Sequence, residues 1–295
     1  GIIAPDGVKV ATISGNYEDD DILGKVSVNY TPSRNHSFYG YIARGYKPGG
    51  INSETSVFDK ETVISVEGGW KGRLFDDTVS ASVAVFNNDY KNFQNTNIDV
   101  TTGRSDVYNI ADASIAGLEF ALDIYLDNLT IDFAGSFIDS EMEPTQPIVN
   151  TRESGSPSLP QCSAGQDASS GTCFDYTPFL VAAGAGPNLY APEKSFTVGI
   201  EYAIELSDGA LLTPRLNYAW IDEQWTNLIY DPETDLLADR GLLSAMVTYE
   251  TGNWRVNAWG RNLTDEEYVS GQQLSNNTEF YGAPRTFGID VNYTF

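Results

Sequence analysis

The feature that most constrains this chain is a strict alternation of apolar with small or polar residues at its end. Over the final strand-length segment, aromatic or aliphatic side chains occupy every second position, at Phe287, Ile289, Val291, Tyr293 and Phe295. Successive side chains of a β-strand point to opposite faces, so this period of two predicts a strand with one apolar face. A strand of a membrane barrel needs an outward apolar face and an inward polar face.

The same alternation recurs through the chain and predicts eleven strands. We expect them at about 22–30, 36–47, 62–74, 78–96, 104–126, 129–141, 196–205, 210–228, 243–250, 254–261 and 284–295. The segment 36–47 carries aromatic or aliphatic groups on both faces, so its outward face is not assigned. Pro214 cannot donate to a strand ladder, and we expect a bulge there.

The connections between these strands alternate in length. Short turns are predicted at 31–35, 75–77, 127–128, 207–209 and 251–253, whereas most other connections are long. This rhythm is typical of a barrel with short periplasmic turns and long extracellular loops. Several strands exceed the roughly 9 to 11 residues that cross a bilayer. The sequence therefore predicts an all-β fold, with antiparallel transmembrane β-barrel strands covering 21–295.

The acidic composition excludes some partners. With 41 Asp and Glu against 17 Lys and Arg, the net charge is −24, whereas nucleic-acid binding requires clustered basic residues. A solvated acidic surface is favoured over an acidic lumen or cation-binding loops. Residues 1–20 lack a clear period and end in acidic residues, so we interpret them as the end of an incomplete extracellular loop. A calcium site is the alternative reading of that acidic run.

Residues 142–191 interrupt the strand rhythm and are rich in Pro, Gly, Ser and Ala. We expect a long inserted extracellular loop, of the kind that is functional or disordered. Cys162 and Cys173 both lie in it, and they are the two cysteines of the chain. No CxxC spacing or histidine neighbour suggests a metal site. A local disulfide formed in an oxidising compartment is favoured over free thiols.

Five segments occur in an order and spacing that resemble one family, the TonB-dependent outer-membrane receptors. These segments are Phe38–Gly50, Val63–Lys71, Val85–Tyr90, Asn262–Tyr268 and Pro284–Phe295. The resemblance implies a barrel in the Gram-negative outer membrane that takes up a scarce small molecule, such as a ferric siderophore, a cobalamin or a carbohydrate. It implies TonB as the source of force, contacted through an amino-terminal plug domain and a short TonB box.

Nothing in this sequence resembles the plug or the TonB box. The family builds a barrel of about 22 strands, and bacterial barrels have even strand numbers, so eleven strands suggest the carboxy-terminal part of a longer receptor. Its two outer strands would otherwise leave unpaired edges in lipid. The resemblance also implies outer-membrane lipid and the barrel-assembly machinery as partners. It assigns the assembly signal to the terminal alternation, from Phe287 through Ile289, Val291 and Tyr293 to Phe295.

No catalytic, cofactor or metal motif was found. His36 is the single histidine, and no Walker loop, HExxH or paired CxxC occurs. Basic and aromatic residues near the predicted outer strand ends could bind an anionic or aromatic ligand; they are Arg44, Tyr46, Lys47, Trp225, Tyr230, Arg240, Arg261 and Tyr281. For each, a place in an interfacial aromatic girdle or a lumen salt bridge is the favoured alternative. Trp225 and Arg261 are the best candidates.

Other functions remain open at this point. A passive porin-like channel would need no plug. A surface adhesin or phage-docking barrel would use the 142–191 loop as its working part. A soluble β-protein is the remaining alternative.

Overall fold

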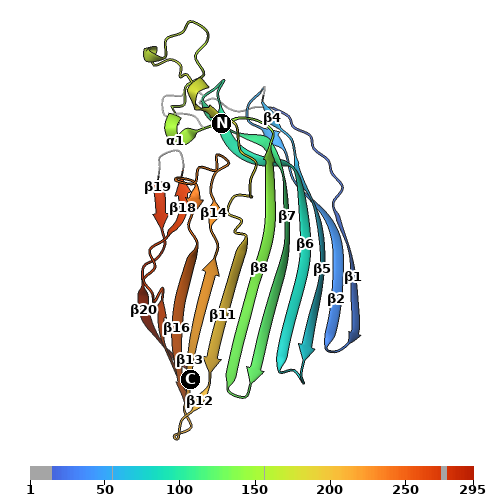
Figure 1. Ribbon diagram of the computed structural model, residues 1–295, viewed down its shortest axis with the longest axis vertical. Helices are drawn as coiled ribbons and strands as arrows, with labels where there is room; N and C mark the ends of the chain where they lie inside the picture. The colour runs from blue at the N-terminus through green and yellow to red at the C-terminus, as the bar shows by residue number, and fades with distance from the viewer. Residues whose placement is uncertain (1–14, 55, 156, 274–277) are drawn as a thin grey trace.

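The computed structural model describes residues 15–54, 56–155, 157–273 and 278–295. Within these ranges, one 12-stranded antiparallel sheet is drawn as a tall curved wall in Figure 1. Eleven strands follow one another in it in the order β1-β2-β5-β6-β7-β8-β11-β13-β16-β17-β20, and the short β12 (Ile204–Glu205) pairs with β13 off this path. The strands are β1 (Gly24–Ser33), β2 (His36–Lys47), β5 (Glu61–Leu74), β6 (Val79–Asp99), β7 (Arg104–Leu126), β8 (Leu129–Pro144), β11 (Lys194–Tyr202), β13 (Leu211–Ile221), β16 (Arg240–Thr251), β17 (Trp254–Arg261) and β20 (Thr286–Tyr293). The predicted fold class and strand count are confirmed.

The connections separate into two kinds at opposite ends of the wall (Figure 1). At the short-turn end, the five turns predicted from the sequence join β1–β2, β5–β6, β7–β8, β12 (Ile204–Glu205) to β13, and β16–β17. At the loop end, most connections are long. The β6–β7 connection is an exception, since residues 100–103 alone join strands of 21 and 23 residues. Because about 9 to 11 residues cross a bilayer, this hairpin projects well beyond such a span.

Two details of the β13 region differ from expectation. The strand predicted over 210–228 leaves the sheet after Ile221, and the chain then forms the separate hairpin of β14 (Gln224–Trp225) and β15 (Leu236–Leu237). The expected bulge at Pro214 is absent, because Pro214 pairs in register with Val247 of β16. On its other side, Pro214 lies opposite the gap in pairing between β11 and β12, where no backbone N–H is needed. β11 and β12 keep one continuous register along β13.

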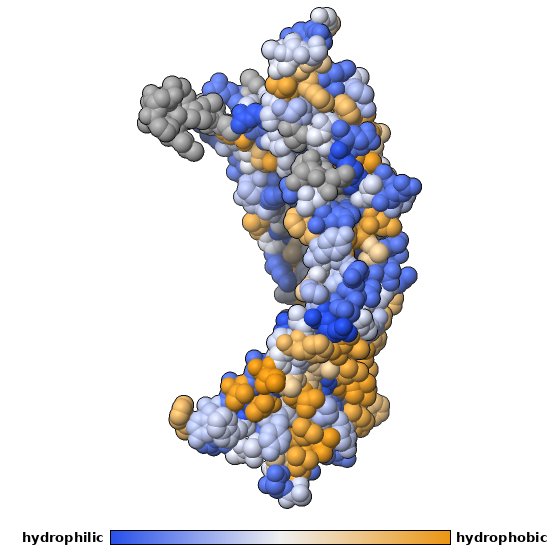
Figure 2. Space-filling model, turned by 90° about the vertical axis from the view of Figure 1, so that its left-hand side faces the viewer, coloured by the Kyte–Doolittle hydropathy of each residue, from blue (hydrophilic) through white to orange (hydrophobic). Residues whose placement is uncertain are grey.

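One face of the sheet is apolar from edge to edge, and we call it the outer face. The pairing of neighbouring strands shows that this face is continuous. Val26 lies opposite Ile42, which lies opposite Val66, and all three are exposed. In β20, Ile289 is 71% exposed. This register also assigns the 36–47 strand, because Ile42 lies on the outer face while Tyr39 and Tyr41 point to the opposite, inner face. Figure 2 shows apolar residues gathered toward the short-turn end, polar residues at the loop end, and a hollowed inner side.

Buried residues gather at the loop end, where the long connections contain short elements. These short elements include β3 (Gly50–Ile51), β4 (Val57–Phe58), β9 (Ile148–Val149), α1 (Thr151–Ser154), η1 (Ala168–Ser170), η2 (Thr177–Phe179), β10 (Leu180–Val181), β18 (Val269–Gln273) and β19 (Thr278–Tyr281). The expected long loop at 142–191 is therefore not structureless, and its first residues extend β8 to Pro144. In the ranges described, no helix is long and apolar enough to span a membrane.

Candidate functional site

The inner face carries paired polar groups rather than an apolar core. The Arg215 guanidinium donates to the Asp132 carboxylate at 2.5 Å. The hydroxyls of Tyr39 and Tyr41 both donate to the Glu67 carboxylate, at 2.7 and 2.8 Å. Such pairs satisfy charged groups that face a wet interior. The inner face of this wall is therefore suited to line an aqueous space.

At the loop end, the connections 145–193 and 222–239 fold over this inner face, and we call them the loop cap. Ala113 and Met142, both on the inner face of the wall, are buried in one hydrophobic cluster with Ile148 and Leu228 of the cap. The backbone of Met142 also exchanges hydrogen bonds with Gly186. The cap is thus held by apolar burial against the projecting parts of β6, β7 and β8.

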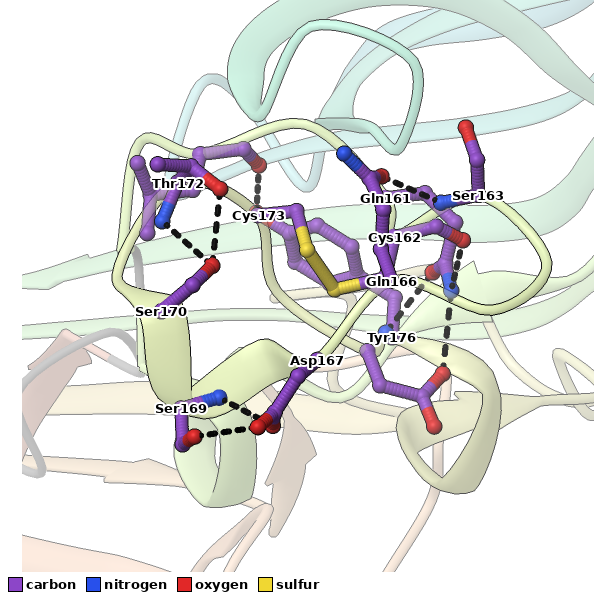
Figure 3. The surroundings of a disulfide bond; sticks show 12 residues. Gln161, Cys162, Ser163, Gln166, Asp167, Ser169, Ser170, Thr172, Cys173 and Tyr176 are labelled. Atoms are coloured by element: carbon purple, nitrogen blue, oxygen red, sulfur yellow. Dashed lines mark hydrogen bonds between the residues drawn. A yellow bond between two sulfur atoms is a disulfide. The ribbon is translucent and has the colours of Figure 1, made fainter.

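A second cluster anchors a disulfide-closed loop. Tyr176 is fully buried with Ile98 and Val149, and its hydroxyl donates to the carbonyl of Leu159 at 2.9 Å. Cys162 and Cys173 form a disulfide above it (Figure 3). Residues 163–172 between them are exposed. The result is a polar loop held at its base by a cross-link and by buried rings.

We expect the disulfide to protect this loop. Replacing Cys162 and Cys173 together by Ser should lower its local stability by about 3 kcal/mol, since the bond closes a loop of roughly a dozen residues. The measurement is the rate at which thermolysin cleaves within 160–175, with dithiothreitol-treated wild-type receptor as a second route to the reduced state. Equal cleavage rates in all three samples would show that burial alone holds the loop.

An ion pair joins the two halves of the loop cap. Arg152 of α1 lies 2.6 Å from the Asp235 carboxylate, with side-chain exposures of 13% and 0%. Its guanidinium also donates to the hydroxyl and to the carbonyl of Thr234, the latter at 2.9 Å. Asp235 in turn accepts the backbone N–H of Asp231 at 3.0 Å. The position of one loop therefore depends on the other.

Between the cap and the tip of the β6–β7 hairpin lies a cavity of about 390 Å³, which we call the mouth cavity. Its apolar lining comes from the buried clusters and includes Ile110, Ile148 and Leu228. Its polar lining consists of amides and hydroxyls, mainly Asn95, Asn97, Ser105, Thr151, Thr226 and Asn227. The volume lies at the small end of the roughly 300 to 1,000 Å³ range of small-molecule sites.

A second hollow lies on the inner face of the wall, with a volume of about 560 Å³. Small residues such as Ala134, Ser136 and Ala219 form its floor, with Glu119 and Arg240 also in its lining. One terminal nitrogen of Arg240 is buried without a hydrogen-bond partner among the described residues. This hollow is an open trough below the cap rather than a closed pocket.

The candidate residues of β2 are placed away from both hollows. Arg44 pairs with Gly24 and Ile64 and shares the outer face with Ile42. Its guanidinium donates twice to the Asp21 carboxylate, at 2.9 and 3.1 Å. Tyr46, two positions on, shares this face, whereas Lys47 ends the strand on the inner face, opposite Glu61. The position of Arg44 and Tyr46 favours a role in the loop ion pairs or at the outer rim. It disfavours contact with a ligand on the inner face of the wall.

Trp225 and Tyr230 lie in the loop cap and touch each other, with ring centroids 5.4 Å apart. Tyr230 packs against the Met142 cluster, and its hydroxyl donates to the Pro187 carbonyl at 2.7 Å. Burial raises the pKa of Tyr230 to about 12, so this hydroxyl stays protonated at physiological pH. Both rings therefore contribute to the packing of the cap beside the mouth cavity.

The remaining candidates are spread over the carboxy-terminal strands. The guanidinium of Arg240 lies 5.1 Å from the ring of Tyr268, and that of Arg261 lies 5.1 Å from the ring of Trp259. Tyr281 in β19 is 70% exposed and donates to Glu279. The structure thus spreads the candidates over the outer face, the loop cap, the inner face and the β18–β19 hairpin, and a role in ligand binding stays a prediction for each.

Reasoning from the sequence missed the residues that line the mouth cavity. Asn95 and Asn97 lie where the projecting part of β6 runs through the polar segment 92–97. Several amide residues inside a long predicted strand were the available signal. Thr151 and Asn227 belong to connections whose path the alternation does not predict. They reach the cavity because the cap folds inward.

The structure assigns no catalytic role to His36. Its imidazole stacks on Trp70 with centroids 6.0 Å apart, and its Nδ1 accepts the indole N–H at 3.3 Å. Within the described part of the chain, no cluster of three His, Cys, Asp or Glu residues is arranged to hold a metal ion.

Comparison with solved structures finds the same wall. The ferric yersiniabactin uptake receptor FyuA from Yersinia pestis superposes with a TM-score of 0.68 at 19% identity, covering 94% of this chain and 38% of that receptor. The siderophore receptor PiuA from Acinetobacter baumannii gives 0.66 at 18% identity, covering 91% and 35%. The ferric-catecholate import receptor Fiu from Escherichia coli K12 gives 0.62 at 18%, covering 92% and 34%.

This chain therefore spans little more than a third of the receptors it matches. At these identities the likeness establishes the fold. The sequence itself matches the family described as TonB dependent receptor-like, beta-barrel, over residues 5–263. That match covers most of the chain. It agrees with the eleven-stranded wall and its apolar outer face. The chain belongs to the TonB-dependent receptor β-barrel family.

Proposed function

We propose that this chain supplies barrel wall and ligand-facing loops to a receptor that takes up a scarce small molecule across the Gram-negative outer membrane. TonB would drive this uptake through a plug domain. The observation that carries the proposal is the mouth cavity, which lies at the loop end between the cap and the tip of the β6–β7 hairpin. The barrel would bind and pass its ligand without covalent change. The matched receptors are named for ferric yersiniabactin uptake, for a siderophore and for ferric-catecholate import. Cobalamins and carbohydrates are the other ligand classes considered.

The membrane placement follows from the two faces of the wall. The apolar outer face would contact lipid along the short-turn half, with the loop end outside the cell. In the described ranges, β1 and β20 each pair with one neighbour. Because an open edge is not tolerated in lipid, we propose that further strands complete the barrel between them. The barrel-assembly machinery would insert the finished receptor.

The test is energy-dependent uptake by the whole receptor. The complete receptor gene is deleted in its host, and accumulation of ⁵⁵Fe-labelled chelates, labelled cyanocobalamin and ¹⁴C-labelled saccharides is compared in the parent, the deletion strain and a TonB-deficient strain. We expect one of these probes to lose uptake to the same extent in both mutants. Uptake that depends on the receptor gene but persists without TonB would contradict active transport and support a passive channel.

A second candidate function has one supporting observation. Residues 163–172 form an exposed polar loop closed by the disulfide, a suitable surface for attachment to a cell or phage. Deleting 163–172 separates the two functions. Lost attachment with unchanged solute uptake would favour an adhesin or docking barrel, and unchanged attachment would remove that candidate.

A further inference from the structure

We propose that the mouth cavity binds a neutral, hydroxyl-rich ligand of the mono- or disaccharide class. This inference rests on the proposed uptake function and names its substrate class. It is argued from the residues around the cavity and not from the ligands of the matched receptors.

The lining of the mouth cavity is uncharged. None of the described residues that form it is Asp, Glu, Lys or Arg, and its polar groups are carboxamides and hydroxyls. Anionic ligands are usually held by charge-assisted hydrogen bonds from Arg or Lys. Carboxamides and hydroxyls can both donate and accept, which matches the alternating donors and acceptors of a polyhydroxy ligand.

Several of these polar groups have unused hydrogen-bonding capacity. The Asn97 side-chain oxygen accepts the N–H groups of Ile98 and Val149, at 2.8 and 3.2 Å, which fixes the carboxamide and leaves its NH₂ without a partner among the described residues. The Asn95 oxygen accepts the N–H of Thr96 at 2.7 Å, which likewise leaves its NH₂ unused. Within the described ranges, the side chains of Thr151 and Asn227 make no hydrogen bond at all.

The cavity also offers the apolar contact that a sugar ring requires. Tyr190 borders it with half of its surface exposed, and Leu189 lies beside it in the lining. The faces of a pyranose ring are formed by C–H groups, which pack favourably on aromatic surfaces, while its hydroxyls point outward to hydrogen-bonding side chains. Polar and apolar groups are thus both present in the lining.

The charged residues next to the mouth cavity lie outside its lining. Asp106 directly follows the lining residue Ser105 and is buried. Burial raises the pKa of Asp106 and the charge of Asp99 raises it further, whereas the charge of Arg104 lowers it. Two cations lie next to lining residues along the chain: Arg104 beside Ser105, and Arg152 beside Thr151. Arg152 lies against the buried Asp235. Neither guanidinium belongs to the lining, so an incoming anion would find no cation in the cavity wall.

Binding is tested with the full-length receptor in detergent by isothermal titration calorimetry. The probes are maltose, cellobiose, xylobiose and N,N′-diacetylchitobiose, against ferric citrate and cyanocobalamin. We expect at least one disaccharide to bind, and Asn227→Ala and Thr151→Val each to weaken it about tenfold, the cost of one lost hydrogen bond at a desolvated site. Asn253→Ala, in the β16–β17 turn at the opposite end, is the matched control and should leave the affinity unchanged.

Several outcomes would overturn this assignment. They are the absence of binding to all four disaccharides at millimolar concentration by a heat-modifiable receptor, equal affinity in the wild type and both cavity variants, or cavity-dependent binding of ferric citrate or cyanocobalamin. TonB-dependent import of an iron chelate would overturn the ligand class while supporting active uptake. Saccharide binding without TonB-dependent accumulation would support the ligand class and contradict active uptake.

Discussion

Replacing Arg152 by Met should destabilise the loop cap by about 3 to 5 kcal/mol, because it leaves the buried Asp235 carboxylate without its counter-charge. Asp235 is fully buried, and the two charged groups lie 2.6 Å apart. The variant also removes the bonds to Thr234 that hold the β14–β15 hairpin against α1. The expected result is an opened cap on an intact wall, because Arg152 contributes to no strand of the sheet.

Hydrogen exchange resolved by mass spectrometry measures this effect. Amides of 224–237 should exchange faster in the Arg152→Met receptor, whereas peptides from β11 and β13 should be unchanged. Lys91→Met is the matched control: Lys91 pairs with Asp112 at 3.0 Å, but both side chains are about half exposed, and such pairs contribute about 0 to 1 kcal/mol. Equal exchange in the two variants would mean that the buried pair is not what holds the cap.

The double variant Arg152→Met with Asp235→Leu provides an internal test. Removing both charges should restore part of the lost stability, since a buried pair replaced by apolar groups of similar size is often neutral. If the double variant exchanges at least as fast as Arg152→Met alone, the loss comes from packing around Arg152 and not from an uncompensated carboxylate.

The second large effect concerns the terminal strand. We expect Phe295→Ala combined with Tyr293→Ala to lower the outer-membrane level of the full receptor several-fold. Phe295 is fully exposed, and its ring lies 5.1 Å from that of Tyr293, which lies 4.7 Å from Trp254. These rings end the apolar outer face at the short-turn end, where amphipathic aromatic side chains suit the membrane interface. The family resemblance assigns the same residues to recognition by the assembly machinery.

Immunoblots of fractionated outer membranes, with and without heating, measure the assembled receptor. Phe280→Ala is the control, because Phe280 is an aromatic residue of β19 that is half exposed yet lies outside the terminal strand. If the double variant reaches the wild-type level, the terminal alternation has no role in assembly. An equal loss in the Phe280→Ala receptor would point to general sensitivity to aromatic removal.

Much of the wall could be predicted from the sequence because side-chain alternation is a local property. The positions of β2 and β7 agree with expectation, and five short turns were placed correctly. Where tertiary contacts competed, the prediction failed. The strand expected to reach residue 228 ends at Ile221, because the following residues pair with β15 rather than with the sheet. Pro214 required no bulge, because strand pairing on its β11–β12 side is interrupted at that position.

The candidate site was predictable to a smaller extent. Basic and aromatic residues near strand ends were reasonable candidates, but strand ends do not reveal on which face a side chain lies. Register decides that, and it places Arg44 on the outer face and Arg240 on the inner face. The uncharged residues that line the mouth cavity carry no recognisable motif. They become neighbours through contacts between segments more than a hundred residues apart, such as Asn97 and Asn227.

The terminal alternation from Phe287 to Phe295, repeated through the chain, by itself determined an antiparallel wall with one apolar face. Five motif segments carried the resemblance to the family to which the chain belongs. The tertiary structure decided where that wall becomes a site. Burial of Met142, Ile148 and Leu228 in one cluster folds two long loops inward over the inner face, and the Arg152–Asp235 pair joins them. The physical reason is that alternation depends on adjacent residues, whereas the cap depends on burying apolar surface from distant segments.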